Sequence, residues 1–157
     1  MPSYIHHVTL TTGHVRRSPR SEVAADAVAV CKGLIEAATD SQHGVPIPGL
    51  PGLRLAADRE GKCILLTVDT DDGARVLTMS IATHSRCGSR EWHLLHTVGQ
   101  TGPLATAGQP CPPEPWVGAR LEPGAARLSP DILMALGDME RCLGWAWVEM
   151  RTADVLE

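Results

Sequence analysis

The stretch from Ser129 to about Met150 most constrains the fold, because its apolar residues recur at spacings of three and four. At about 100° per residue these positions share one side of a helix, which predicts an amphipathic helix packed on a core. Ser129 is a good N-cap and Pro130 suits the first helical position. The predicted buried stripe contains Ile132, Leu136, Met139, Leu143, Ala146, Trp147 and Met150.

The other side of this predicted helix is a candidate interaction face. An exposed tryptophan beside methionine and arginine is typical of the residues that dominate protein interfaces. We therefore expect Trp147 in the core and Trp145 exposed, either packed under a neighbouring loop or acting as an interface anchor. Gly137 and Gly144 mark a flank where another backbone comes close. The candidate face carries Met134, Asp138, Arg141, Trp145 and Glu149.

Five further segments have the residue types of strands, with β-branched residues and flanking turn residues. Cys63–Asp69 begins apolar on both faces, which predicts a central strand covered on both sides. Adjacent residues of a strand face opposite ways, so His6 and His7 do not bind one ion together. The predicted strands are Tyr4–Thr12, Leu53–Asp58, Cys63–Asp69, Arg75–Thr83 and Trp116–Leu121.

Helical periodicity appears twice more. A first helix is predicted from Pro19 or Glu22 to Ala38, capped by Ser18 or Ser21, with Val23, Ala27, Val30, Leu34 and Ala38 facing the core. A short helix is predicted from Ser85 or Ser89 to His96. The stretch from Thr39 to Gly52 is predicted to be irregular, and residues 98–115 a proline-rich surface loop. Together these elements predict a single α+β domain: a mainly antiparallel sheet of about four to five strands carrying two long helices and one short helix.

Composition narrows the class of protein. A chain of 157 residues buries a core without disulfides or metal, and its net charge of −4 argues against a general nucleic-acid binder. Five separated cysteines, Cys31, Cys63, Cys87, Cys111 and Cys142, are typical of a reducing compartment, where free cysteine acts as a small apolar residue. With no leader and no apolar run of about 18 residues, we expect a cytoplasmic protein without membrane contact.

The segment from His14 to Arg20 is a basic connector in the sequence. His14, Arg16, Arg17 and Arg20 precede the first predicted helix, and helix N-termini favour anions. This pattern indicates a phosphate or nucleic-acid contact, with a solvated basic connector as the alternative.

Histidine and cysteine cluster once, at His84, Cys87, His93 and His96. Both residue types bind zinc, and His93 and His96 have the spacing that places two side chains on one side of a helix. The alternative is a pair of partly exposed helix residues beside a buried Trp92.

Catalytic signatures are missing from the sequence. It contains no G-x-S-x-G, no H-E-x-x-H and no glycine-rich phosphate loop. We therefore expect binding rather than catalysis, with no cofactor and no catalytic residue, and a zinc-dependent enzyme or zinc-binding protein as a further alternative.

Both ends of the chain carry a resemblance. Tyr4–Ser18 (YIHHVTLTTGHVRRS) and Gly137–Trp147 (GDMERCLGWAW) resemble small uncharacterised proteins carried by prophages and mobile elements of proteobacteria. Small acidic proteins of that context often bind and block host machinery, including CRISPR complexes and restriction systems.

The resemblance implies a genetic context, and from that context we expect a non-enzymatic interaction protein that inhibits a host defence complex, of the anti-CRISPR or antirestriction type. Its expected partner is a host protein or a ribonucleoprotein, with nucleic acid as the alternative and a homodimer left open. The expected contact residues are Met134, Asp138, Arg141 and Trp145, together with Trp116 at the end of the proline-rich loop.

Overall fold

The computed structural model describes residues 4–9, 14–60, 63–82 and 116–156. These ranges contain the long helices α1 (Ala25–Thr39) and α3 (Pro130–Leu156) and the 3-10 helices η1 (Arg20–Glu22) and η3 (Pro123–Arg127). Their strands are β1 (Tyr4–Thr9), β2 (His14–Pro19), β3 (Val45–Pro46), β4 (Leu53–Glu60), β5 (Cys63–Thr70), β6 (Arg75–Ala82) and β7 (Trp116–Leu121).

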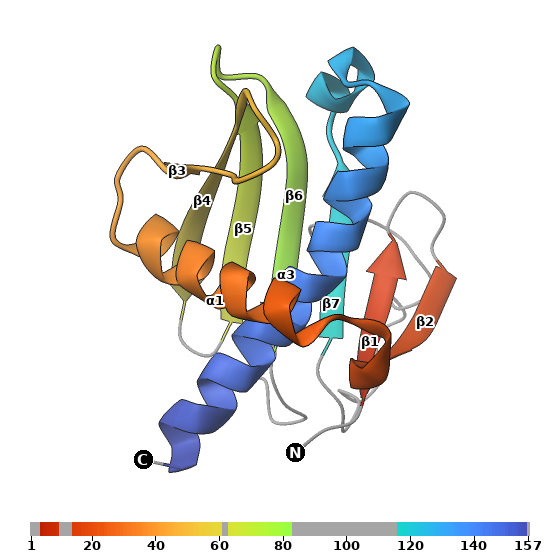
Figure 1. Ribbon diagram of the computed structural model, residues 1–157, viewed down its shortest axis with the longest axis vertical. Coiled ribbons are helices and arrows are strands. Elements are labelled where there is room, and N and C mark those ends of the chain that lie inside the picture. The colour runs from red at the N-terminus through yellow and green to blue at the C-terminus, as the bar shows by residue number, and fades with distance from the viewer. Residues whose placement is uncertain (1–3, 10–13, 61–62, 83–115, 157) are drawn as a thin grey trace, which may run out of the picture.

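The strands form one sheet in the order β2-β1-β7-β6-β5-β4-β3 (Figure 1). From β3 to β7 every neighbouring pair is antiparallel, whereas β1 lies parallel to β7. The α+β class and the mainly antiparallel sheet are therefore confirmed. Each of the five predicted strands is present, and β5 is central because it lies between β4 and β6.

Two strands were not expected. The segment from His14, predicted to be a connector, is β2 and pairs with β1, and Val45–Pro46 within the predicted irregular stretch is β3 at the sheet edge. Both strands are defined by partners elsewhere in the chain, and a proline is tolerated only at such an edge. The expected number of strands was therefore too low.

The first helix begins later than predicted. It starts at Ala25, after η1, and its N-cap residue Ala24 makes no side-chain capping bond, so the predicted serine caps are wrong. At the other end of the chain, α3 continues past Met150 to Leu156. The predicted short helix ending at His96 and the loop at 98–115 lie outside the described residues.

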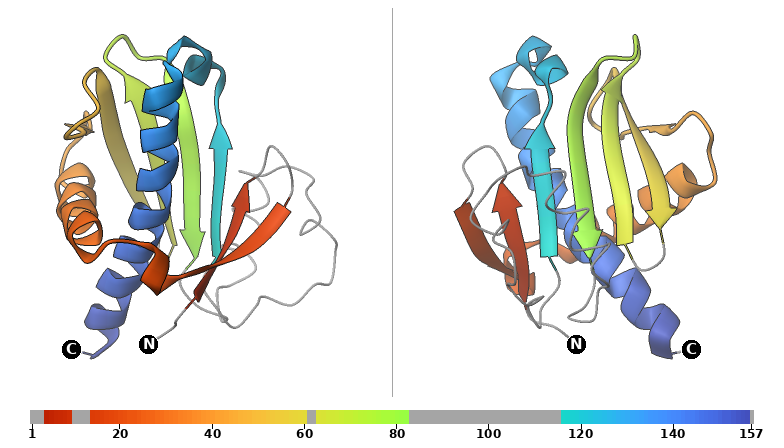
Figure 2. Two further views of the ribbon diagram at one scale, coloured as in Figure 1. Left: turned by 45° about the vertical axis from the view of Figure 1, so that its right-hand side comes forward. Right: turned by 180° about the vertical axis from the view of Figure 1, so that it is seen from behind.

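Both long helices cover the same face of the sheet (Figure 2). Beneath them Ile64, Leu66 and Val68 of β5 are at most 1% exposed. Cys63, at the start of the same strand, is also fully buried. The core thus lies between the sheet and the helices.

The middle of α3 is buried on every side. Seven consecutive residues, Cys142 to Val148, are buried, and they span about two helical turns. The sheet covers one side of α3, and α1 crosses over another (Figure 1). Trp147 is 2% exposed, as predicted, but Trp145 is 0% exposed. The prediction of an exposed Trp145 is wrong because α3 packs against both the sheet and α1, so its buried surface is wider than the single stripe that the spacing indicated.

Gly144 permits the close approach of α3 to the sheet. A Cβ at this position would lie 2.9 Å from Cγ2 of Val117 and 3.2 Å from Cδ1 of Ile5. The predicted close contact is confirmed at Gly144. It is not confirmed at Gly137, which is exposed and has open space where a Cβ would stand.

Candidate functional site

A groove lies between α1, the first half of α3 and the segment Ile47–Leu50, with a cavity volume of about 370 Å³. We call it the α1–α3 groove. Its lining from α1 includes Val30, Cys31 and Leu34, and its lining from α3 includes Asp138, Met139 and Cys142.

The segment Ile47–Leu50 closes one side of the groove because it is folded as a turn. The amide of Leu50 donates to the carbonyl of Ile47 at 3.1 Å, and Gly49 adopts a positive φ of 81°. Ile47 and Leu50 are consequently buried, whereas Pro48 and Gly49 are exposed at the rim. A glycine suits this backbone because other residues rarely adopt a positive φ.

The side of α1 that lines the groove is the one predicted to face the core. The fully buried residues of α1 are instead Val28, Cys31, Ile35 and Ala38. Of the predicted stripe only Ala38 is buried; Val23, Ala27 and Leu34 are half-buried, and Val30 is 55% exposed. Helix α1 therefore has two apolar sides, one in the core and one left open to the groove.

The rim of the groove is charged. Asp138, the one charged residue among its described lining residues, has a side chain 72% exposed and lies 3.5 Å from Nη2 of Arg141. Arg141 also lies 3.7 Å from Oε2 of Glu22, so its charge is shared between two carboxylates. Asp138 therefore places a solvent-exposed carboxylate at the rim, paired with Arg141.

Met134 extends this surface along α3. It is 70% exposed and stands one helical turn before Asp138. Within the described residues the other exposed large apolar side chains are Val30 and Leu121. Val30 lines the groove, whereas Met134 lies outside its lining, one helical turn from Asp138.

Two thiols lie in the floor of the groove. Cys31 and Cys142 are both buried and free, one from each helix. Burial, together with the neighbouring Cys142, raises the pKa of Cys31 to about 12. Burial also raises the pKa of Cys142, against the opposing effect of Arg141 and Arg20. Both thiols are therefore protonated at neutral pH and are poor nucleophiles.

The predicted contact residues do not form a single exposed face. Met134 and Asp138 are exposed, and Arg141 is half-buried in its ion pairs. Trp145 is removed from this surface by its burial, and Trp116 is the first residue of β7. Of the predicted contact residues on α3, only Asp138 is among the residues that line the groove.

The α1 side was missed. Val30 was assigned to the core, and Cys31 was treated as an apolar filler in a helix. The signal was present in the sequence, because α1 carries more apolar residues than one buried stripe needs. Nothing in the sequence shows that its second stripe meets α3.

The predicted anion-binding residues are not gathered at a helix N-terminus. His14, Arg16 and Arg17 lie in β2, whereas α1 begins only at Ala25. The Nε of Arg20 lies 2.5 Å from Oε2 of Glu149, and its Nη1 donates to the carbonyl of Val23. The guanidinium group of Arg20 is therefore engaged within the fold.

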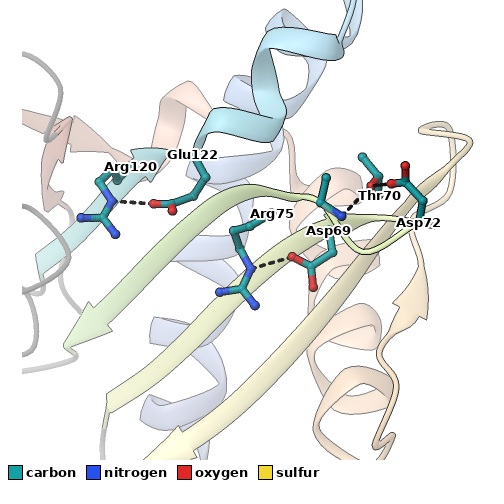
Figure 3. Close-up of polar contacts among 7 residues, drawn as sticks. Asp69, Thr70, Asp72, Arg75, Arg120 and Glu122 are labelled. Carbon is teal, nitrogen blue, oxygen red and sulfur yellow. Dashed lines mark hydrogen bonds and ion pairs between the residues drawn. The ribbon is translucent and has the colours of Figure 1, made fainter.

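Other arginines are paired at the end of the sheet shown in Figure 3. The Nε of Arg75 lies 2.6 Å from Oδ1 of Asp69, and the Nε of Arg120 lies 2.6 Å from Oε1 of Glu122 (Figure 3). These pairs offset positive charge, so this end of the sheet does not form a basic patch.

The predicted zinc ligands His84, Cys87, His93 and His96 lie outside the described residues. Across the ranges that the structure describes, no three His, Cys, Asp or Glu side chains come together as a metal site. Among the described helices, none combines the length and the apolar character needed to cross a membrane. Comparison with protein-family models, curated proteins and solved structures gave no match to this chain.

Proposed function

We propose that the protein is a non-catalytic binding module and that the α1–α3 groove receives an apolar, positively charged segment of a partner protein. The observation that carries the proposal is the second apolar side of α1. Val30 is 55% exposed on that side, although the helix already buries a full stripe in the core. An apolar side of a helix that lines an open groove suits the apolar side chains of a partner.

The size of the groove supports a narrow occupant. Its volume of about 370 Å³ lies near the lower end of the roughly 300–1,000 Å³ usual for binding pockets. It is an open trough between two helices, which suits a few apolar side chains from one face of a partner helix. A flat domain surface would not fill it.

Charge supports a basic occupant. Asp138 stands at the rim from α3, and Asp26 is exposed on α1, one turn before Val30. The chain as a whole has a net charge of −4. Lysine or arginine flanking the apolar residues of the partner would meet these carboxylates, and such complementarity sets orientation and association rate more than affinity.

The proposal also concerns the identity of the partner. The resemblance of both chain ends to proteins of prophages and mobile elements supports a component of a host defence complex, either a protein or a ribonucleoprotein. Blocking that component is then the biological role. This part rests on the resemblance, and the groove supports only the mode of binding.

Affinity capture from a host lysate with three matched baits tests the proposal. The baits are the wild type, Val30→Asp, and Leu121→Asp, which alters an exposed apolar residue outside the groove lining. We expect one partner to be retained by the wild type and by Leu121→Asp and lost by Val30→Asp. Circular dichroism and thermal melting establish that each bait is folded. A partner retained by Val30→Asp, or lost equally by both variants, would overturn the proposal.

Nucleic-acid binding by His14, Arg16 and Arg17 remains the alternative prediction. No observation in the described residues favours it, and Arg20 is engaged with Glu149. Its test is the salt dependence of binding to nucleic acid, because contacts with phosphates weaken steeply as salt rises.

A further inference from the structure

Three sulfur-bearing side chains line the floor of the α1–α3 groove. Cys31 comes from α1, whereas Met139 and Cys142 come from α3. The two cysteines are 3% and 8% exposed, and neither is in a disulfide. Two helices that are far apart in the sequence thus bring two thiols and a thioether to one cavity.

Their positions favour convergence on one point. Met139 and Cys142 are three residues apart on α3 and therefore share one side of the helix. Cys31 faces the same cavity from the opposite wall. Both cysteines are buried where they line this cavity.

The donor set selects a class of metal. Thiolate and thioether sulfur are soft ligands, which suit Cu(I) in particular. Structural zinc takes four ligands from cysteine, histidine and carboxylates. In the part of the chain that the structure describes, no three of those residue types come together. We propose that Cys31, Cys142 and Met139 bind one Cu(I) ion in the floor of the groove.

Binding is a ligand exchange with no change of oxidation state. The two S–H bonds break, their protons pass to water, and two copper–thiolate bonds form. The thioether of Met139 adds a third, dative bond. The resulting site carries one negative charge, and Arg141 is the residue next to Cys142 in α3.

A bound ion would join α1 to α3 beneath the groove. The inference goes beyond the proposed partner binding and does not depend on it, because the three sulfur atoms belong to this chain alone. Partner capture without added copper and copper binding without partner are separate measurements, so either proposal can fail without the other.

The test is an anaerobic titration of the reduced full chain with Cu(I), in competition with a chromogenic Cu(I) chelator. The background variant replaces Cys63, Cys87 and Cys111 by serine and keeps only the two proposed thiols. We expect one ion per chain in the wild type and in this variant. Substitutions outside the coordination sphere typically weaken metal binding by roughly 10–100-fold. Cys31→Ser and Cys142→Ser each remove a ligand and should therefore weaken copper binding by more than that.

X-ray absorption at the copper edge identifies the atoms bound to copper. Replacing a residue that has only a structural role would not change them. We expect three sulfur ligands in the wild type and two in Met139→Leu, a replacement of similar size. Cys31→Ala serves in place of Cys31→Ser if the serine variant does not fold. Three outcomes would overturn the proposal. Copper binding could survive both substitutions of Cys31, it could disappear in the background variant, or the absorption spectrum could show nitrogen and oxygen ligands.

Discussion

Arg20 and Glu149 are joined by an ion pair of 2.5 Å between Nε and Oε2, across 129 positions of the sequence. The Nζ of Lys32 lies 2.9 Å from the other carboxylate oxygen of Glu149. The side chain of Glu149 is only 12% exposed. The carboxylate of Glu149 therefore links both η1 and α1 to α3 through ion pairs, next to the stretch of α3 that is buried on all sides.

Replacing Glu149 by glutamine should destabilise the protein. The neutral amide cannot serve both cations, and hydrogen bonds that involve charged groups contribute about 1.5–3 kcal/mol. We expect a loss of about that size in the free energy of unfolding, measured by urea denaturation. The control is Arg127→Ala, because Arg127 and Asp72 form an ion pair whose side chains are 63% and 68% exposed. Equal effects of the two substitutions would contradict this account.

The effect of Glu149 should depend on pH. Burial alone would raise the pKa of Glu149, but the hydrogen bonds and charges of Arg20 and Lys32 outweigh it and hold the pKa below the ordinary value of 4.5. A carboxyl group with a lowered pKa in the folded state stabilises fully above its unfolded pKa and loses that stabilisation as pH falls through the folded pKa. The difference between wild type and Glu149→Gln should be constant at neutral pH and shrink below pH 4.5. A difference that grows on acidification would mean that folding raises the pKa of Glu149, contrary to this account.

Two glycines of α3 should respond to alanine in opposite directions. Gly144→Ala places a methyl group 2.9 Å from Val117 Cγ2, and overpacking of this kind costs about 1–3 kcal/mol. Gly137→Ala meets open space on an exposed helix side and should stabilise by roughly 0.5–1 kcal/mol through helix propensity. Thermal melting of the pair measures both effects. Stabilisation by Gly144→Ala would show that α3 does not approach the sheet as closely as described.

Trp145→Ala should destabilise the protein by about 3–5 kcal/mol, because the side chain is fully buried. This substitution therefore reports on folding and not on partner contact. Trp145→Phe should cost less, since it also removes an indole N–H that has no hydrogen-bond partner among the described groups. Urea denaturation of both variants measures the two costs. A fully stable Trp145→Ala would mean that the indole is not packed in the core.

Much of the fold was predictable because the evidence for it is local. The apolar residues at the start of Cys63–Thr70 identified a central strand, and the spacing from Ile132 to Met150 identified α3. Each of these patterns lies within a single strand or helix. The strands β2 and β3 lack such a pattern: β2 has the residues of a basic connector, β3 is only two residues long, and each is defined by its pairing with a neighbouring strand.

The site was predictable only in part, for the same reason. Asp138, which lines the groove, was predicted from the outer side of one helix. The groove itself depends on how α1 crosses α3, and no pattern within either helix records that crossing. Trp145 shows the consequence most clearly: its position outside the apolar stripe of α3 predicted exposure to solvent, and the folded chain buries it completely.

The parallel pairing of β1 with β7 has a consequence for the order of events during synthesis. Residues His6–Thr9 pair with Trp116–Ala119, so the first strand meets its neighbour only after about a hundred further residues are made. At roughly 5–20 residues per second, that is a wait of about 5–20 s. During this time the β1–β2 pair has no sheet to join, and a free strand edge invites the wrong partner. The parallel pair of β1 and β7 is therefore among the last parts of the sheet that can form during synthesis.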